Sequence, residues 1–230
     1  MKFDLVLLDI DGTLLDFDLA EKNALADTLK EYNFICNDEI LNRYHEINIF
    51  YWKQLEKGLV DKKQLAHKRY EQLFSEYRIE TDIDIFNFKY RNKLKEGAYL
   101  LNNAMAICKE LYINKVKIGV ASNGGNDIQI RRIKKTGLDK YLTYMFVSED
   151  IGYNKPHKEY FEYIFQKIEN VSKEKIIMVG DSLTADIQGG KNAGIATCWY
   201  NPNGEAGMES IRPDYEIKDL LELRGLIGII

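Results

Sequence analysis

Two aspartates near the N-terminus, Asp9 and Asp11, have a spacing that suits phosphate chemistry. They end the apolar run LVLLDID, and residues two apart on a strand face the same side. Gly12 lets the backbone turn sharply, and Thr13 offers a hydroxyl and an amide to an anion. A pair of carboxylates can divide a reaction, one attacking and the other transferring protons. An aspartate-rich turn is the alternative for DxD alone, but chance gives DxDGT in roughly one in a few hundred chains of this size.

Residues suited to holding a phosphate follow a later apolar run. After KIGVA come Ser122, Asn123 and Gly124, which offer a hydroxyl and exposed amides. Lys155 precedes Pro156, whose fixed φ stiffens the backbone that carries the ammonium group. Each signal is weak alone, because Ser-Asn-Gly is ordinary turn sequence and a single lysine is usually a surface residue.

Two further aspartates follow the apolar run IIMVG. Asp181 comes directly after it, and Asp186 lies five residues later, near the start of an expected helix. The helix dipole alone would also explain an acidic residue at Asp186. The two pairs of aspartates nevertheless follow strand-like runs in the same way.

These residues need elements that bring them to one place. Short apolar runs rich in β-branched residues are typical of buried parallel strands: FDLVLLD, VKIGVAS, YMFVS, IIMVGD and IATCWY. Helix-length segments lie between them, two of which end at Gly137 and Gly194. The alternation predicts an α/β fold with a Rossmann-like, doubly wound parallel sheet. Ligands of such sheets bind beyond the carboxyl ends of the strands, where the polar residues above stand.

Residues 16 to about 95 break this alternation. Four amphipathic helical stretches occur there, with no strong strand between them. Their expected N-cap residues are Asp18, Asp38, Asp61 and Asp82. The sequence therefore predicts a core domain formed by residues 1–15 and 98–230, and an inserted helical domain formed by residues 16–97.

Composition narrows the class of protein. With 45% hydrophobic and 30% charged residues the chain is globular, and a net charge of −4 argues against nucleic acid as a partner. No apolar run reaches the length of a membrane span and no export signal is evident, so we expect a cytoplasmic protein without a membrane partner.

Three cysteines without a CxxC pair indicate reduced, buried thiols. Whether the chain is a monomer or a homodimer stays open. A basic cluster in a helical pattern is interpreted as a solvated helix face: Arg131, Arg132, Lys134 and Lys135.

In order, the motifs DxDGT, SN, KP and GDSxxxD resemble those of the haloacid dehalogenase-like hydrolase superfamily. Insertion of helices directly after the first motif resembles the superfamily arrangement with a helical, C1-type cap. The segments INIFYWKQLEKGLVDKKQL, VSEDIGYNKPHKEYF and GDSLTADIQGGKNAGIATCWYN resemble the branch of bacterial pyrimidine 5'-nucleotidases that act on non-standard nucleotides. The segment before Ala98 reads LKEG, without the proline expected in the second hinge, so the cap boundary near residues 95–98 stays open.

The resemblance implies a phosphatase that works through an aspartyl-phosphate. Asp9 is the candidate nucleophile, and Asp11 is the candidate general acid and then base. Lys155 would neutralise Asp9 and the phosphate, while Ser122 and the amides after it would hold the transferring oxygens.

Charge at this site implies a divalent cation, because several carboxylates would otherwise repel an anionic substrate. Oxygen ligands suit Mg²⁺, and the candidates are Asp9, the Asp11 carbonyl and Asp181. Asp186 either ligates the ion directly or orients Lys155 and bound waters; we favour the second.

The cap residues Asn48, Trp52 and Lys53 are candidate substrate contacts, although Trp52 also fits an apolar helix face. The expected substrate is a nucleoside monophosphate, with the cap closing over base and sugar. A sugar-phosphate or phosphoglycolate phosphatase, or a hexose-phosphate mutase, remains an alternative on the same core. A carbon–halogen hydrolase is disfavoured, since that reaction needs neither the acid Asp11 nor magnesium. A non-catalytic binding protein is a remote alternative, because neither the nucleophile nor the lysine is missing.

Overall fold

The structure is a computed structural model that describes residues 1–229. The chain divides into two compact units: Met1–Asp16 together with Tyr99–Ile230, and Phe17–Ala98. These limits lie one residue beyond those predicted from the sequence. We call the first the core unit and the second the helical unit, and describe each separately.

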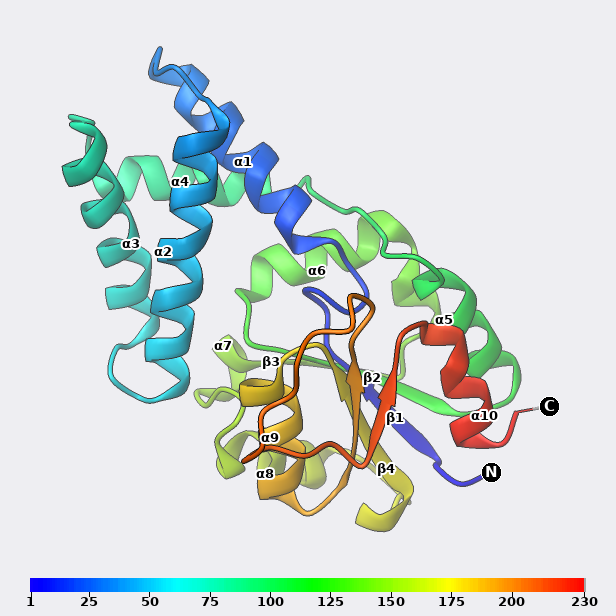
Figure 1. Cartoon of the computed structure of the whole chain (residues 1–230). Helices are drawn as coiled ribbons and strands as arrows, with labels where there is room; N and C mark the ends of the chain where they lie inside the picture. The colour runs from blue at the N-terminus through cyan, green and yellow to red at the C-terminus, as the bar shows by residue number, and fades with distance from the viewer. Residues whose placement is uncertain (230) are drawn as a thin grey trace. The chain divides into compact units, whose positions relative to one another are not determined.

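A parallel sheet of six strands forms the centre of the described part of the core unit, in the order β3-β2-β1-β4-β5-β6 (Figure 1). The strands are β1 (Leu5–Leu8), β2 (Lys117–Ser122), β3 (Tyr144–Val147), β4 (Ile176–Gly180), β5 (Ala196–Tyr200) and β6 (Tyr215–Ile217). The predicted α/β class with a doubly wound sheet is confirmed. The short strand β6 was not predicted; its YEI sequence gives little apolar signal.

The core helices follow the strands. They are α5 (Ala104–Ile113), α6 (Asn126–Thr136), α7 (Ser148–Ile151), α8 (Lys158–Lys167), α9 (Gln188–Ala193) and α10 (Leu223–Ile227). Short turns of other helix types are η1 (Leu138–Tyr141), η2 (Lys173–Lys175), η3 (Leu183–Ile187) and η4 (Leu220–Glu222), of which η3 is a π-helix.

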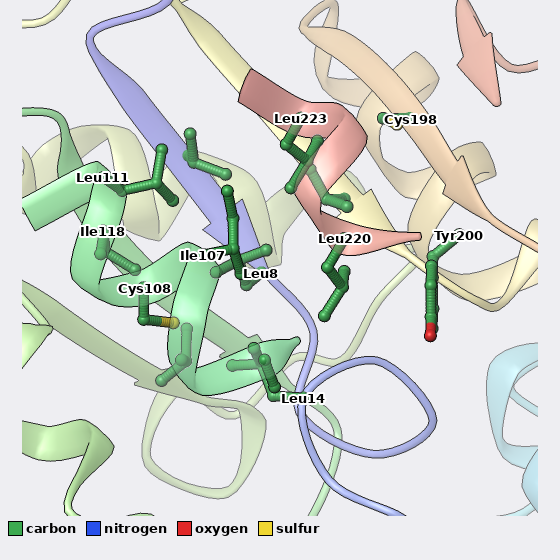
Figure 2. Close-up of a cluster of buried hydrophobic side chains, with 14 of the residues drawn as sticks. Leu8, Leu14, Ile107, Cys108, Leu111, Ile118, Cys198, Tyr200, Leu220 and Leu223 are labelled. Atoms are coloured by element: carbon green, nitrogen blue, oxygen red, sulfur yellow. The ribbon is translucent and has the colours of Figure 1, made fainter. Parts of the chain in front are cut away.

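Each face of the sheet is covered by its own helices. On one face, Ile107, Cys108 and Leu111 of α5 and Leu223 of α10 pack against side chains such as Leu8 of β1 (Figure 2). On the other face, α8 packs its aromatic and aliphatic residues on the alternate positions of the same strands. Burial on both faces explains why the strand sequences are continuous apolar runs without alternation.

Register places the functional strand ends together. Leu8, the last residue of β1, pairs with Val120 of β2 and with Val179 of β4. The residues that follow these three positions therefore emerge at the same edge of the sheet. That edge is the carboxyl end of the strands, where open α/β sheets bind their ligands.

The helical unit consists of α1 (Phe17–Glu31), α2 (Asp38–Glu56), α3 (Lys62–Tyr77) and α4 (Ile83–Leu94). Asp61 and Asp82 cap α3 and α4 as predicted, each accepting a backbone N–H in the first turn. The other two N-caps were predicted wrongly. Asn37 caps α2, so Asp38 lies in its first turn, and Asp18 lies in the first turn of α1. An acidic residue fits the first turn and the cap equally well by charge, so composition alone cannot separate the two positions.

Buried tyrosines and phenylalanines fill the interior of the helical unit. Tyr70 stacks on Tyr44 with ring centroids 5.7 Å apart and meets Phe86 edge to face at 5.1 Å. The Arg69 guanidinium lies over the Tyr70 ring, 4.8 Å from its centroid, and donates to Asn48. Across the described residues, every helix is too short or too polar to cross a lipid bilayer.

Candidate active site

Asp9 emerges from β1 into the centre of the sheet edge. Its side chain is buried, with 6% of the residue exposed, and its backbone N–H donates to the Val179 carbonyl of β4. Gly12 then turns the chain with φ at +86°, and a Cβ there would lie 2.5 Å from Asp181 Oδ2. The predicted sharp turn is confirmed, and the close approach to Asp181 adds a second reason for glycine.

Lys155 contacts three of the predicted site residues, namely Asp9, Asp186 and Asn123. Its ammonium group donates to Asp9 Oδ1, to Asp186 Oδ1 at 2.7 Å and to the Ala121 carbonyl at 2.6 Å. Asn123 fixes the backbone of Lys155 from both sides, donating to its carbonyl at 2.9 Å and accepting from its N–H at 2.8 Å. The Lys155–Pro156 peptide bond is cis. The Asn123 side chain thus orients the lysine loop, and the contact of the Asn123 backbone amide with phosphate stays a prediction.

Two carboxylates complete this group at the end of β4. Ser182 caps η3, whose residue Asp186 is buried and accepts from the Ser182 N–H at 3.1 Å. Both oxygens of Asp186 thus have protein donors, Lys155 on one and Ser182 on the other. Asp181 exchanges hydrogen bonds with Thr13, whose hydroxyl accepts its N–H at 3.1 Å and donates to its Oδ1 at 3.2 Å.

Asp9, Asp181 and Asp186 can hold a divalent cation. One oxygen from each lies within 4.8 Å of the others, and Asp181 is the member exposed to solvent. An all-oxygen donor set with one open side is what Mg²⁺ needs, since this ion keeps several of its waters. The residues present therefore fit the predicted ion.

The raised pKa values of the carboxylates also favour a bound cation. Burial raises the pKa of Asp9 well above its ordinary value, and the Asp186, Asp181 and Asp11 charges add to that rise while Lys155 opposes it. The pKa of Asp181 is also raised, to about 7, mainly by burial among protein atoms and next by the charge of Asp186. Asp181 is exposed to solvent, which weakens the effect of burial on its pKa. For Lys155, burial would lower the pKa, but the Asp186 and Asp9 charges outweigh it and raise the pKa. The Lys155 ammonium therefore stays charged, but its single positive charge does not neutralise the carboxylates around it.

Asp11 lies outside this group of carboxylates and contacts α6. Its Oδ1 accepts from Arg132 Nη1, and its Oδ2 accepts from Gln129 Nε2 at 2.5 Å. Arg132 is completely buried, so the prediction of a solvated face is wrong at this residue; Arg131 beside it is exposed. A sequence signal existed, because on a helical wheel Arg132 falls between Ile128 and Ile133, whereas Arg131 falls outside that arc.

The loop after β2 carries the predicted phosphate-binding residues. Ser122 is buried, and its hydroxyl accepts from the Gly124 N–H at 3.1 Å and from Gln129 Nε2 at 2.9 Å. The Ser122 hydrogen is still available as a donor. The contacts that Ser122, Gly124 and Thr13 would make with phosphate stay predictions.

The predicted substrate contacts of the helical unit differ in their surroundings. Asn48 is buried, donates to Glu21 at 2.6 Å and accepts from Arg69 at 2.9 Å, so it belongs to a polar network within this unit. Trp52 is half-buried and Lys53 exposed on the same helix α2. Their contact with a substrate stays a prediction.

Fold and site together define an α/β protein with an aspartate cluster at the carboxyl end of its sheet, and comparison with known proteins identifies its family. Residues 6–200 match the haloacid dehalogenase-like hydrolases. The chain belongs to this family, which confirms the resemblance found in the motifs.

Relatives that match over nearly the whole chain include enzymes. The pyrimidine 5'-nucleotidase PynA of Streptococcus pneumoniae is 38% identical over 96% of this chain and 95% of its own length. The pyrimidine 5'-nucleotidase YjjG of Escherichia coli is 31% identical over 99% of both chains. A solved structure of the HAD-hydrolase YfnB from Bacillus subtilis, bound to magnesium, has a TM-score of 0.94 and 36% identity, covering 100% of both chains. The chain is accordingly an enzyme of the phosphatase type within this family.

Proposed function

We propose that the protein is a Mg²⁺-dependent 5'-nucleotidase that hydrolyses pyrimidine nucleoside monophosphates through an aspartyl-phosphate. The observation that carries the chemistry is the buried ion pair of Lys155 with Asp9 and Asp186, beside the exposed carboxylate of Asp181. The pyrimidine substrate rests on the likeness to PynA and YjjG.

A count of charge supports a divalent ion. Asp9, Asp181 and Asp186 contribute three negative charges when ionised, and Lys155 contributes one positive charge. The difference, a net charge of −2, is the charge that one divalent cation neutralises. Asp9 and Asp181 are the side chains that would hold it, with the Asp11 carbonyl as a further ligand, while Asp186, whose two oxygens accept from Lys155 and Ser182, either ligates directly or, as we favour, orients Lys155 and bound waters. When bound, the ion supplies positive charge to the phosphoryl oxygens.

Asp9 is the nucleophile in this proposal. One of its oxygens attacks phosphorus in line, the new O–P bond forms, and the bond from phosphorus to the 5'-oxygen breaks. Lys155 keeps the attacking carboxylate in place through its bond to Asp9 Oδ1. It also offers positive charge near the incoming phosphate. Ser122 and the loop amides after it would donate to the transferring oxygens.

Asp11 transfers the protons. The 5'-alkoxide is a poor leaving group, so it takes a proton from Asp11 as its bond to phosphorus breaks. In the second half, Asp11 accepts a proton from a water molecule whose oxygen attacks the aspartyl-phosphate. Inorganic phosphate leaves, and Asp9 regains its carboxylate.

Release of inorganic phosphate across a panel of substrates tests the proposal. The panel holds uridine, thymidine, adenosine and guanosine monophosphates, glucose 6-phosphate and phosphoglycolate, each with Mg²⁺ and with EDTA. We expect uridine and thymidine monophosphates to give the highest kcat/KM, and EDTA to abolish turnover. Full activity after exhaustive chelation contradicts the metal. Equal or better hydrolysis of the sugar phosphate or phosphoglycolate contradicts the substrate while leaving the reaction class intact.

A further inference from the structure

We propose that Gln129 and Arg132 of α6 are positioning residues for the proton-transfer step: they hold the Asp11 carboxylate in the orientation from which it serves the leaving oxygen and the water. The inference rests on the proposed function of Asp11 and deepens it. Neither α6 residue touches the reacting atoms in this scheme. Both act through Asp11.

The contacts place one α6 donor on each oxygen of Asp11. Arg132 Nη1 bonds to Oδ1 and Gln129 Nε2 bonds to Oδ2, so rotation of the carboxylate about its own axis is blocked. A carboxylate oxygen has two acceptor positions, and each donor uses only one. Each oxygen therefore keeps a position for a substrate oxygen or a water while the group stays fixed.

The two donors are themselves held rigidly. Arg132 is completely buried and Gln129 is 1% exposed, and Arg132 Nη1 also donates to Gln129 Oε1 at 3.2 Å. Ile128 and Ile133 of the same helix are buried and anchor α6 on the core. Residues three apart on a helix share a face, which lets Gln129 and Arg132 reach Asp11 together.

A buried guanidinium needs a reason, since taking it from water costs several kcal/mol before pairing offsets the loss. Its partner here is Asp11, whose side chain is 25% exposed, while Arg132 itself is 0% exposed. A structural ion pair of this kind could have formed on the surface at no such cost. The cost of burying Arg132 is explained if the arrangement serves to fix the orientation of Asp11.

Gln129 adds a connection to the phosphate side of the site. Its Nε2 donates to Ser122 Oγ at 2.9 Å as well as to Asp11. A Cβ at Gly124 would lie 2.4 Å from the same nitrogen, so the loop needs glycine where this side chain passes. Gln129 thus fixes the proposed phosphate donor and the proposed acid together, whereas Arg132 contacts Asp11 and Gln129.

The difference between the two residues sets the expected kinetics. Arg132→Met should lower kcat for uridine monophosphate about 10- to 100-fold, because misplacement of a catalytic group by about 1 Å costs up to that factor. Its KM should stay within threefold. Gln129→Met should lower kcat similarly and should also raise KM, because Ser122 loses a donor.

The leaving group separates positioning from a general loss of structure. Rapid mixing with 4-nitrophenyl phosphate reports phosphoenzyme formation that needs no acid, because nitrophenolate leaves unprotonated. In Arg132→Met the burst of nitrophenolate should keep its wild-type rate within threefold, while the later steady phase slows like kcat for the nucleotide. Arg131→Met, on the exposed face of the same helix, is the matched control and should match wild type in both phases.

A double-mutant cycle gives the decisive result. In an Asp11→Asn background, Arg132→Met should add less than a threefold further loss, because its effect passes through Asp11. A further loss as large as in the wild-type background overturns the inference, as does a burst slowed as much as nucleotide turnover. Should Arg132→Met not fold, Arg132→Lys carries the same comparison, and a crystal structure of that variant shows directly whether Asp11 has moved.

Failure of the inference and failure of the proposed function give different results. If the wild-type protein releases no phosphate from any substrate, the proposed function is wrong. If Asp11→Asn turns over nucleotide like wild type, the role of Asp11 is wrong. If the wild-type protein releases phosphate, Asp11→Asn impairs nucleotide turnover, and Arg132→Met is indistinguishable from Arg131→Met, only the positioning role is wrong.

Discussion

Replacing Lys155 by methionine removes the charge that joins two buried carboxylates and leaves a side chain of nearly the same length. Its ammonium group contacts Asp9 and Asp186, which are 6% and 1% exposed, and is itself 2% exposed. Breaking a buried ion pair by removing one partner costs about 3 to 5 kcal/mol. For a chain of this size each kcal/mol lowers Tm by about 2 to 4 °C, so a fall of about 6 to 20 °C follows. Turnover should fall at least about 10²- to 10³-fold, the usual effect of losing one electrostatic donor.

The pH dependence of the loss has a definite sign. Lys155 lowers the pKa of Asp9, which burial and three other carboxylates already raise, so the variant raises that pKa further. A carboxyl group with a raised pKa in the folded state stabilises the fold while it is protonated and loses that contribution as pH rises through its folded pKa. The Lys155→Met variant should therefore be least destabilised in acid and increasingly destabilised toward neutral pH.

Urea unfolding followed by tryptophan fluorescence measures the change. The chain has two tryptophans, and a Trp52→Phe background leaves Trp199, which is buried in the core unit beside Asp181. Lys158→Met is the matched control, because Lys158 forms an exposed pair with Glu162 on α8, and exposed ion pairs contribute little to stability. A loss below about 1 kcal/mol for Lys155→Met at neutral pH, near that of the control, would refute the assignment of a buried ion pair that carries both stability and catalysis.

Other variants and conditions test separate parts of the site. Asp9→Asn should abolish turnover yet leave Tm unchanged or higher without metal, because the amide removes one of the crowded charges while Lys155 keeps Asp186 as its ion-pair partner; turnover near wild type would place the nucleophile elsewhere. Mg²⁺ at about 100 times its Kd should stabilise the fold by about 2.7 kcal/mol, seen as a higher Tm that EDTA reverses and that Asp181→Asn weakens; no shift up to about 10 mM would contradict the ion. In the helical unit, the hydrogen bond to Glu21 raises the pKa of His45, with Asp18 and Glu46 adding to it, so the pair stabilises the fold in acid and loses this effect as pH rises through that pKa. Melts of wild type and His45→Gln should accordingly differ at pH 5.5 and converge by about pH 8.5, and a gap that widens with pH would refute the assignment.

The carboxylates of the site were predictable because strand ends are readable from sequence. Asp9 and Asp181 each follow a continuous apolar run, and parallel strands bring their carboxyl ends to one edge. The register of β1 with β4 then makes them neighbours. The short strand β6 offered no such signal, because Tyr215 and Glu216 break the apolar run before Ile217. Prediction worked where a single local pattern determined the geometry.

The partners of those carboxylates were harder to predict, because a charge does not show from composition whether it is buried. Arg131 and Arg132 are adjacent and chemically identical, yet one is exposed and the other completely buried. Only helical periodicity separates them: on a helical wheel Arg132 falls between the buried residues Ile128 and Ile133, and Arg131 falls outside that arc. The side-chain contacts of Asn123 were likewise not predictable, because its side-chain amide bonds to the backbone of Lys155, 32 residues away.

The two buried cations divide the carboxylates of the site by task. Lys155 pairs with Asp9 and Asp186, so it belongs to the group that would meet phosphorus and the metal. Arg132 pairs with Asp11, the proposed proton carrier, and comes from a helix that also reaches Ser122 through Gln129. A carboxylate with its own cation is less affected by the charge of its neighbours than a carboxylate that shares its cation with another. This separation is what the proposed mechanism requires, with Asp9 as the nucleophile and Asp11, two residues away in the chain, as the proton carrier.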